Sequence, residues 1–402
     1  MEKKTTRRVV RKIARNRRDH HNSVVKIVVG IMAVILVLNL ILPSRDFSAN
    51  ENRSLAQRPS ISLASLKDGS FFTDFASYYA DQFLLRDLWM SIKFHADFLM
   101  NQREFSGVFV GKDGYLLADP EKPDKNAVSK TVAAMNAFAE EFSDREMNMI
   151  LVPDAATILG ENLPANAPVR DQLSDIRAFQ MDLADTIRTI DAASALRSHA
   201  TERIYYRTDH HWTSEGAYAV FRAAADSLKL DADDVRFKAH TVSESFQGTL
   251  ASKSGDHHRH DQITIYEPQG TDALYVVNYP DLQTRSRSMF VSAQLEEKDQ
   301  YTVFFGGNHP LVEIQTTVDN GRSLLIFKDS YANSFIQFLT PFYQTIIMVD
   351  PRYYYDDVSI VMRDYGVTDV LYLYSADTLL VDTSLADVLN AAVEARKAAE
   401  EA

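Results

Sequence analysis

The chain of 402 residues contains no cysteine. This absence excludes disulfide bonds, a cysteine nucleophile and metal sites built on thiolates. The chain is nevertheless long enough for one large domain or two, and its 46% content of hydrophobic residues supports a proper core.

Acidic residues outnumber basic ones outside the N-terminal end. Ten Lys or Arg residues and only two acidic residues fall within 1–26, so the net charge of −12 for the whole chain becomes −20 for the remainder. A remainder this acidic does not hold nucleic acid or an anionic polymer by bulk charge. We therefore predict no nucleic-acid partner.

A long apolar run follows the basic end. Residues 24–42 are interrupted only by Lys26 and Asn39, and their length suits a bilayer core of about 30 Å. The charge bias predicts a cytoplasmic N-terminus with the rest of the chain outside. A cleavable signal peptide is the alternative, but no small-x-small site follows the run. An extracytoplasmic chain without cysteine fits an organism that does not rely on disulfides.

The predicted organisation is therefore a basic cytoplasmic tail (1–23), a transmembrane anchor (24–42), an extended linker (43–65) and an extracytoplasmic domain (66–402). In that domain, helical patterns alternate with short apolar runs, which favours an α/β fold with a parallel sheet. The predicted helices cover 71–100 (two helices), 127–142, 171–190, 216–230, 357–365 and 384–402. The predicted strands cover 147–152, 200–206, 324–327, 343–350 and 369–374, with a hairpin over 108–117. A polar stretch with short alternating strands, 250–284, is expected to form a β-rich insertion.

Ser330 stands at a junction of a predicted strand and a predicted helix. Open α/β sheets bind ligands at the carboxyl ends of their strands, where this hydroxyl would lie. The backbone N–H groups that follow belong to a helix start, so we expect them to be unpaired and able to stabilise an oxyanion.

Asp209, His210 and His211 form the second candidate segment. A serine becomes a good nucleophile when a base takes its proton, and a carboxylate fixes the tautomer of that base. In an extended stretch Asp209 and His211 point to the same side. We therefore predict His211 as base, Asp209 as its orienting carboxylate and His210 as structural.

Simpler or different roles are open for the same residues. Asp-Ser pairs at strand ends also cap helices, and Asp209 with the two histidines suits zinc. The polar loop 256–261, with three histidines and two aspartates, invites a metal interpretation, although one loop is not a coordination shell. Asp154 ends a strand and either lines the site or caps a turn. Arg352 also follows a strand, where it either holds a substrate group or forms an ion pair.

The segment Asp209-His210-His211-Trp212, followed by Thr213 and 216–218, resembles the DHHW family, relatives of the alginate O-acetyltransferases. Further stretches that carry the resemblance lie at 51–55, 111–116, 306–310 and 328–334. The resemblance extends from about residue 44 to about residue 380. It implies an SGNH-hydrolase-like (flavodoxin-like) fold with a circularly permuted order, because Asp-x-His precedes the serine.

The resemblance also implies a Ser-His-Asp triad of Ser330, His211 and Asp209. Candidates for the oxyanion hole or for substrate contacts are Gly307, Asn308, Tyr331 and Arg352, although a tight turn explains the Gly-Gly-Asn run equally well. No cofactor and no metal are predicted.

The function expected from this resemblance is O-acyl transfer, most simply of acetyl, to a cell-envelope or exopolysaccharide. A membrane-bound O-acyltransferase that passes acyl groups across the bilayer is the expected protein partner. Two alternatives are an esterase with the same triad and a non-catalytic glycan-binding protein that uses exposed aromatics such as 353–355.

Overall fold

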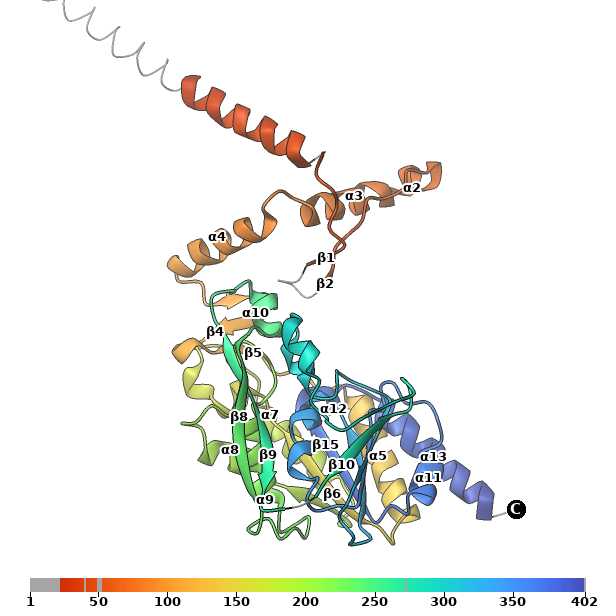
Figure 1. The fold of residues 1–402 in the computed structure, drawn as a ribbon. Helices are drawn as coiled ribbons and strands as arrows, with labels where there is room; N and C mark the ends of the chain where they lie inside the picture. Colours follow the sequence, from red (N-terminus) through yellow and green to blue (C-terminus); the bar gives the residue numbers. More distant parts are fainter. Residues whose placement is uncertain (1–21, 40, 49–52, 272, 401–402) are drawn as a thin grey trace, which may run out of the picture. The chain divides into compact units, whose positions relative to one another are not determined.

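The computed structural model describes residues 22–39, 41–48, 53–271 and 273–400 (Figure 1). Most of the predicted basic tail, 1–21, lies outside the described residues, as do Glu51 and Asn52 of the resemblance. The chain divides into two compact units, Met1–Lys93 and Phe94–Ala402, and each is considered by itself.

The first unit contains a helix over Asn22–Asn39 that is long and apolar enough to cross a membrane. The elements that follow are β1 (Phe47–Ser48), β2 (Arg53–Ser54), α2 (Leu63–Asp68), α3 (Ser70–Asp81) and the start of α4 (Arg86–Leu99). Hydrogen bonds to the Arg53 guanidinium, 2.6 and 2.9 Å long, hold the pKa of Asp81 at about 2. This ion pair joins β2 to the end of α3.

The second unit contains most of the regular structure. Its helices are α5 (Lys125–Glu141), α6 (Ala155–Ile158), α7 (Gln172–Met181), α8 (Ala192–Ser198), α9 (Ser214–Ala224), α10 (Thr249–Ser254), α11 (Val358–Asp364), α12 (Ala376–Leu379) and α13 (Ser384–Glu400). Its 3₁₀ turns are η1 (Lys112–Gly114), η2 (Gly160–Asn162), η3 (Ser292–Glu296), η4 (Gln300–Val303), η5 (Ser330–Ser334) and η6 (Ile336–Phe338).

The strands of the second unit form three sheets. They are β3 (Glu104–Phe105), β4 (Val108–Val110), β5 (Leu116–Ala118), β6 (Glu146–Val152), β7 (Ile187–Ile190), β8 (Arg236–Phe246), β9 (Asp261–Gln269), β10 (Tyr275–Tyr279), β11 (Thr284–Ser286), β12 (Leu311–Thr316), β13 (Ser323–Lys328), β14 (Thr345–Val349) and β15 (Asp369–Ser375). The large sheet has the order β11-β10-β12-β14-β13-β15-β6-β7, while β3-β4-β5 and β8-β9 form small antiparallel sheets.

The predicted α/β fold is confirmed, but the large sheet is mixed. Its five strands β14, β13, β15, β6 and β7 are parallel, as expected. The other three, β11, β10 and β12, pair antiparallel and extend the sheet beyond β14. The parallel strands need helical crossovers, whereas β10 and β11 are joined by a short turn, and short turns join antiparallel strands.

Helices cover both faces of the parallel strands, so β13 is buried along its whole length. Leu324 and Ile326 belong to the core shared with α8 and α9, whereas Leu325 and Phe327 belong to the core shared with α5, α11 and α13. This alternation explains the continuous apolar run in the sequence. It also leaves the carboxyl ends of the parallel strands as the place where polar side chains gather.

Several predicted elements take another form. The predicted helix over 171–190 ends at Met181, and Ile187–Ile190 forms β7, because Ile187 and Ile190 are buried beside β6. The predicted strand over 200–206 is reduced to a single bridge between Tyr205 and Trp212. The helix predicted after Ser330 consists of the 3₁₀ turns η5 and η6.

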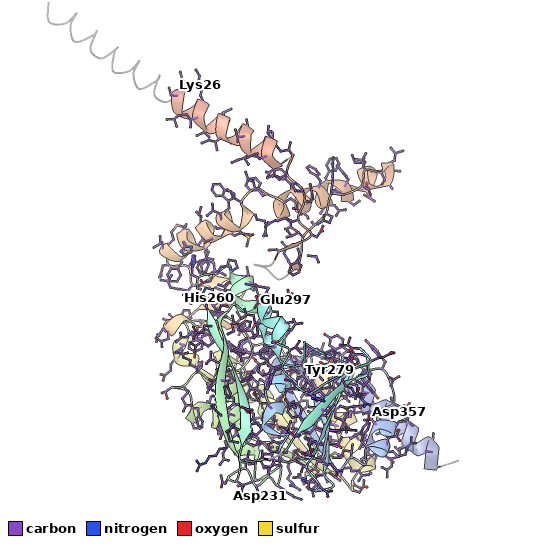
Figure 2. All side chains as sticks on the ribbon, viewed as in Figure 1. Lys26, Asp231, His260, Tyr279, Glu297 and Asp357 are labelled. Carbon is purple, nitrogen blue, oxygen red and sulfur yellow. The ribbon has the colours of Figure 1, made fainter. Side chains whose placement is uncertain are left out.

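The predicted insertion over 250–284 has no sheet of its own. Its strand β9 pairs with β8, which begins earlier in the chain, and its strand β10 joins the large sheet. In Figure 2, His260 and Asp231 mark opposite ends of the β8–β9 hairpin, which lies along the second unit.

Candidate active site

Ser330 lies two residues after the end of the central strand β13. The side chain of Asp329 holds the turn: its Oδ1 accepts the N–H of Tyr331 (3.0 Å), and its Oδ2 accepts the N–H and hydroxyl of Ser375 (3.0 and 2.7 Å). Asp329 is fully buried. It therefore joins the carboxyl ends of the neighbouring strands β13 and β15 and fixes the position of Ser330 between them.

The backbone donors after Ser330 are not free. The Tyr331 N–H donates to Asp329 Oδ1, and the Ala332 N–H donates to the Asp329 carbonyl (3.3 Å). The expectation of unpaired N–H groups is therefore wrong at these two positions, because the turn is 3₁₀ and Asp329 caps it. Among the hydrogen bonds of the described residues, none uses the N–H of Ser330 itself.

The three predicted triad side chains lie in one hydrogen-bonded chain. The distance from His211 Nε2 to Ser330 Oγ is 2.8 Å, and the distance from His211 Nδ1 to Asp209 Oδ1 is 2.5 Å. The other carboxylate oxygen of Asp209 accepts the N–H (2.8 Å) and hydroxyl (3.0 Å) of Thr249. Asp209 and His211 are both buried, at 2% and 6% exposure.

The loop that carries Asp209 is held by residues from the β8–β9 hairpin and α10. Asp261 accepts hydrogen bonds from the N–H of Thr208 (2.8 Å), its hydroxyl (2.6 Å) and the N–H of Arg207 (3.0 Å). Gly248 packs directly against Asp209, since a Cβ at 248 would lie 2.2 Å from the Asp209 Cβ. Only glycine fits there, which places α10 against the carboxylate.

Aromatic residues fix the imidazole and the serine turn. Tyr301 stacks on His211 with ring centroids 3.9 Å apart and 13° between the planes, and its hydroxyl donates to the carbonyl of Ser330 (3.0 Å). The Trp212 indole N–H donates to the carbonyl of Tyr331 (2.9 Å), and the Tyr331 hydroxyl donates to the carbonyl of His210. Tyr301 was not predicted from the sequence, because it lies in an irregular region with no motif around it.

His210 does not point away from the site as an extended segment would require. The segment 207–211 is a series of bends, so the His210 and His211 rings lie side by side with centroids 3.9 Å apart. His210 Nδ1 lies 2.8 Å from Thr249 Oγ1, and its side chain is 46% exposed. His210 is therefore a partly exposed neighbour of the imidazole.

A small pocket of about 100 Å³ opens beside Ser330. It is bounded by the ends of β6, β13 and β15 together with the Asp209 loop and α10. The lining residues are Ala118, Asp154, Ala155, Ala156, His210, Leu250, Ser330, Tyr331, Ser375, Asp377 and Thr378. Asp154 therefore lines the site, and its side chain does not cap the helix that follows.

The remaining candidates form a polar cluster around Lys328. The buried Lys328 ammonium donates to Asn308 Oδ1 and Asn333 Oδ1 (3.0 Å each) and lies 3.4 Å from Asp350 Oδ2. Arg352 donates to both oxygens of Asp350 (2.8 and 2.7 Å), so it forms the structural ion pair that the sequence left open. This cluster was not predicted from the sequence, because the alternation of residues in a strand does not show whether a lysine is buried or exposed.

Gly307, with φ of +120°, lies in the turn that precedes Asn308. A positive φ of this size suits glycine, which supports the tight-turn interpretation of the Gly-Gly-Asn run. Asn308 is exposed and contacts the Ser330 turn through Lys328 and Asn333.

Asp209, His210 and His211 are also the one group of at least three potential metal ligands found in the described part of the chain. Their donor atoms already hydrogen-bond to one another, to Ser330 and to Thr249. A metal would have to displace these bonds, so the arrangement fits proton transfer better. In the loop 256–261, Asp256 pairs with Arg259 (3.0 Å) and Asp261 holds Thr208, which makes both carboxylates structural.

Comparison with known proteins shows what the chain is similar to. Residues 184–349 match the family model described as DHHW protein. The resemblance to the DHHW family is confirmed. A crystal structure of a DHHW family protein from Eubacterium siraeum is similar with a TM-score of 0.60 and 25% identity, over 70% of this chain and 95% of that one.

Two further proteins are similar over smaller shares or at lower identity. The structure of Bacillus cereus PatB1 with a sulfonyl adduct has a TM-score of 0.58 at 18% identity, over 69% of this chain and 97% of that one, and shares the fold. The probable alginate O-acetylase AlgJ of Pseudomonas aeruginosa is 25% identical over 42% of this chain and 45% of its own length. The chain thus spans about half of that curated relative.

The electrostatics of the site favour a neutral imidazole. Burial and, to a smaller extent, charge on His210 lower the pKa of His211 to about 4, although Asp209 acts in the opposite direction. Burial also opposes ionisation of Asp209, but the two imidazoles and the Thr249 N–H keep its pKa below the usual value. At neutral pH the site therefore contains a carboxylate and a neutral base, as proton abstraction from serine requires.

We predict that His211 titrates near pH 4 and that His210→Gln raises its pKa, because the variant removes a neighbouring positive charge. The folded-state value lies below the unfolded value of about 6.5, so this contribution to stability is complete above pH 6.5 and is lost as the pH falls towards 4. NMR of the imidazole resonances of the full-length protein measures the pKa of His211. The variant His211→Asn assigns the resonance, and His240→Gln is the control. An unchanged titration in His210→Gln would contradict the prediction.

Proposed function

We propose that the chain is a membrane-anchored O-acyltransferase that moves an acyl group, most simply acetyl, onto a polysaccharide outside the membrane. The observation that carries this proposal is the hydrogen-bonded chain Asp209–His211–Ser330 at the carboxyl end of a central parallel strand. The likeness to proteins named as O-acetylases supports the acyl class of the transferred group.

In the first step, His211 Nε2 takes the proton of Ser330 Oγ as the oxygen attacks the acyl carbon of a donor. The donor's leaving group departs with that proton, and an ester remains on Ser330. In the second step, a sugar hydroxyl gives its proton to His211 and attacks the ester carbon. The bond from the acyl carbon to Ser330 Oγ then breaks, and Ser330 recovers its proton from His211.

The N–H of Ser330 is the nearest backbone candidate for stabilising the oxyanion of both steps, since the next two N–H groups are occupied. Asn308 is a second candidate, because Lys328 and Asn333 hold its carbonyl oxygen and leave its amide nitrogen for another partner. Gly307 would contribute by shaping the turn that carries Asn308. Arg352 would contribute through its ion pair with Asp350. The order Asp209, His211, Ser330 corresponds to a circularly permuted SGNH-like arrangement.

Hydrolysis is the same chemistry with water as acceptor, so an esterase is the alternative enzyme. The alternative function, non-catalytic glycan binding through exposed aromatic residues, is less favoured. Of the three tyrosines 353–355, Tyr354 is buried and only Tyr353 and Tyr355 are exposed. A membrane-bound O-acyltransferase remains the proposed source of acyl groups, and polysaccharide the proposed acceptor.

We predict that the full-length protein in detergent releases p-nitrophenol from p-nitrophenyl acetate with an initial burst. Ser330→Ala and His211→Ala should each lower this rate by at least about a hundredfold, because general-base catalysis alone contributes roughly 10²–10⁴-fold. Ser245→Ala, at an exposed serine of the hairpin, is the control. Equal rates in the wild type and both site variants would favour the binding-protein alternative.

We also predict that the helix over Asn22–Asn39 retains the chain in the membrane. Full-length protein should stay in the pellet after extraction of membranes with alkaline carbonate, and external protease should digest the part after residue 66 in intact cells. Replacing Val34 and Leu36 by aspartate tests whether this helix is what holds the chain in the membrane, since charged residues at the centre of a span are costly. Carbonate-soluble wild-type protein would contradict the anchor.

A further inference from the structure

Two acidic side chains lie beside Ser330 and have no part in the proton transfers described above. Asp154 follows β6 and Asp377 follows β15, and β15 lies between β6 and β13 in the parallel part of the sheet. Asp154, Asp377 and Ser330 therefore all stand at the same sheet edge, and all three line the pocket.

Gln172 contacts the carboxyl group of Asp377 and the backbone of Asp154. Its amide nitrogen donates to Asp377 Oδ1 (2.9 Å), while its oxygen accepts the backbone N–H of Asp154 (2.9 Å). Asp377 Oδ1 also accepts the N–H of Glu121 (2.9 Å). Gln172 is 1% exposed, so these contacts belong to the buried wall of the pocket.

Asp154 holds its proton more tightly than an ordinary carboxyl group does. Burial and the neighbouring Asp377 raise the pKa of Asp154 well above its ordinary value, and the two side chains hydrogen-bond to each other. The pair thus offers both an O–H donor and carboxylate acceptors. Adjacent hydroxyl groups of a sugar, each of which is donor and acceptor, match this set.

The imidazole of His210 is the one basic side chain among the residues that line the pocket. None of its lining residues, all of which are described, is Lys or Arg. The nearby cations Lys328 and Arg352 both contact Asp350. An acceptor that carries a carboxylate next to its reacting hydroxyl would face the acid pair with no lysine or arginine in the pocket lining, and like charges at short distance repel strongly in a partly buried site.

We infer that Asp154 and Asp377 form the acceptor subsite, which binds sugar hydroxyls next to Ser330 and restricts the acceptor to sugars without a carboxylate. This inference rests on the proposed function. The pair orients the acceptor and exchanges no net proton with it. The volume of about 100 Å³ accommodates an acyl group and a hydroxyl-bearing edge of the sugar, while the rest of the glycan stays outside.

The test compares two acceptors that differ at one carbon: methyl β-glucoside and methyl β-glucuronide. The full-length protein is acylated with p-nitrophenyl acetate, and the acetylated sugar is quantified by mass spectrometry. We expect the wild type to prefer the glucoside by at least about tenfold. Asp377→Asn keeps an oxygen for Gln172 and Glu121 but removes the charge, so the preference should shrink to less than about threefold.

Asp154→Asn provides a second variant and should raise the acceptor KM for the glucoside. Asp231→Asn, at the exposed far end of the hairpin (Figure 2), is the matched control. Equal transfer to the two sugars, transfer to neither, or an unchanged preference in Asp377→Asn would overturn the subsite. A missing burst in the wild type would instead contradict the proposed function, and the subsite with it.

Discussion

The hydrogen bond between His211 Nε2 and Ser330 Oγ joins two segments that are 119 residues apart in the chain. Neither segment is regular at this point, so the surrounding structure must hold both. Asp329 ties the serine turn to β15, and Asp261 with Gly248 ties the histidine loop to the hairpin and α10. Tyr301 contacts both segments at once. The proposed chemistry depends on these supports as much as on the three reacting side chains.

The sequence singled out the three side chains of the proposed triad because they follow strong local patterns. Ser330 comes after four apolar residues that are buried on both faces, and the spacing of Asp209 and His211 suggested their pairing. The predicted direction of the His210 side chain was wrong, because the chain bends where an extended segment was expected. The prediction of free N–H groups after Ser330 was also wrong, since a 3₁₀ turn capped by its own aspartate cannot be distinguished from a helix start in the sequence.

The supporting residues could not be predicted in the same way. Asp261 and Tyr301 lie in stretches without periodicity, and their contacts depend on tertiary packing. The antiparallel strands β10–β12 were missed as part of the large sheet because alternation in a sequence does not reveal which sheet a strand joins. Asp154 and Asp377 each end an apolar run, and only the order of strands β6 and β15 brings them together.

The central claim is that Ser330 is a nucleophile activated by His211. Treatment of the full-length protein with phenylmethanesulfonyl fluoride, followed by peptide mass mapping, tests it most directly. The account predicts a single sulfonyl adduct on Ser330, formed much more slowly in His211→Ala, because the hydroxyl then lacks its base. Modification spread over other serines at comparable rates, or equal modification of Ser330 in the variant, would contradict it.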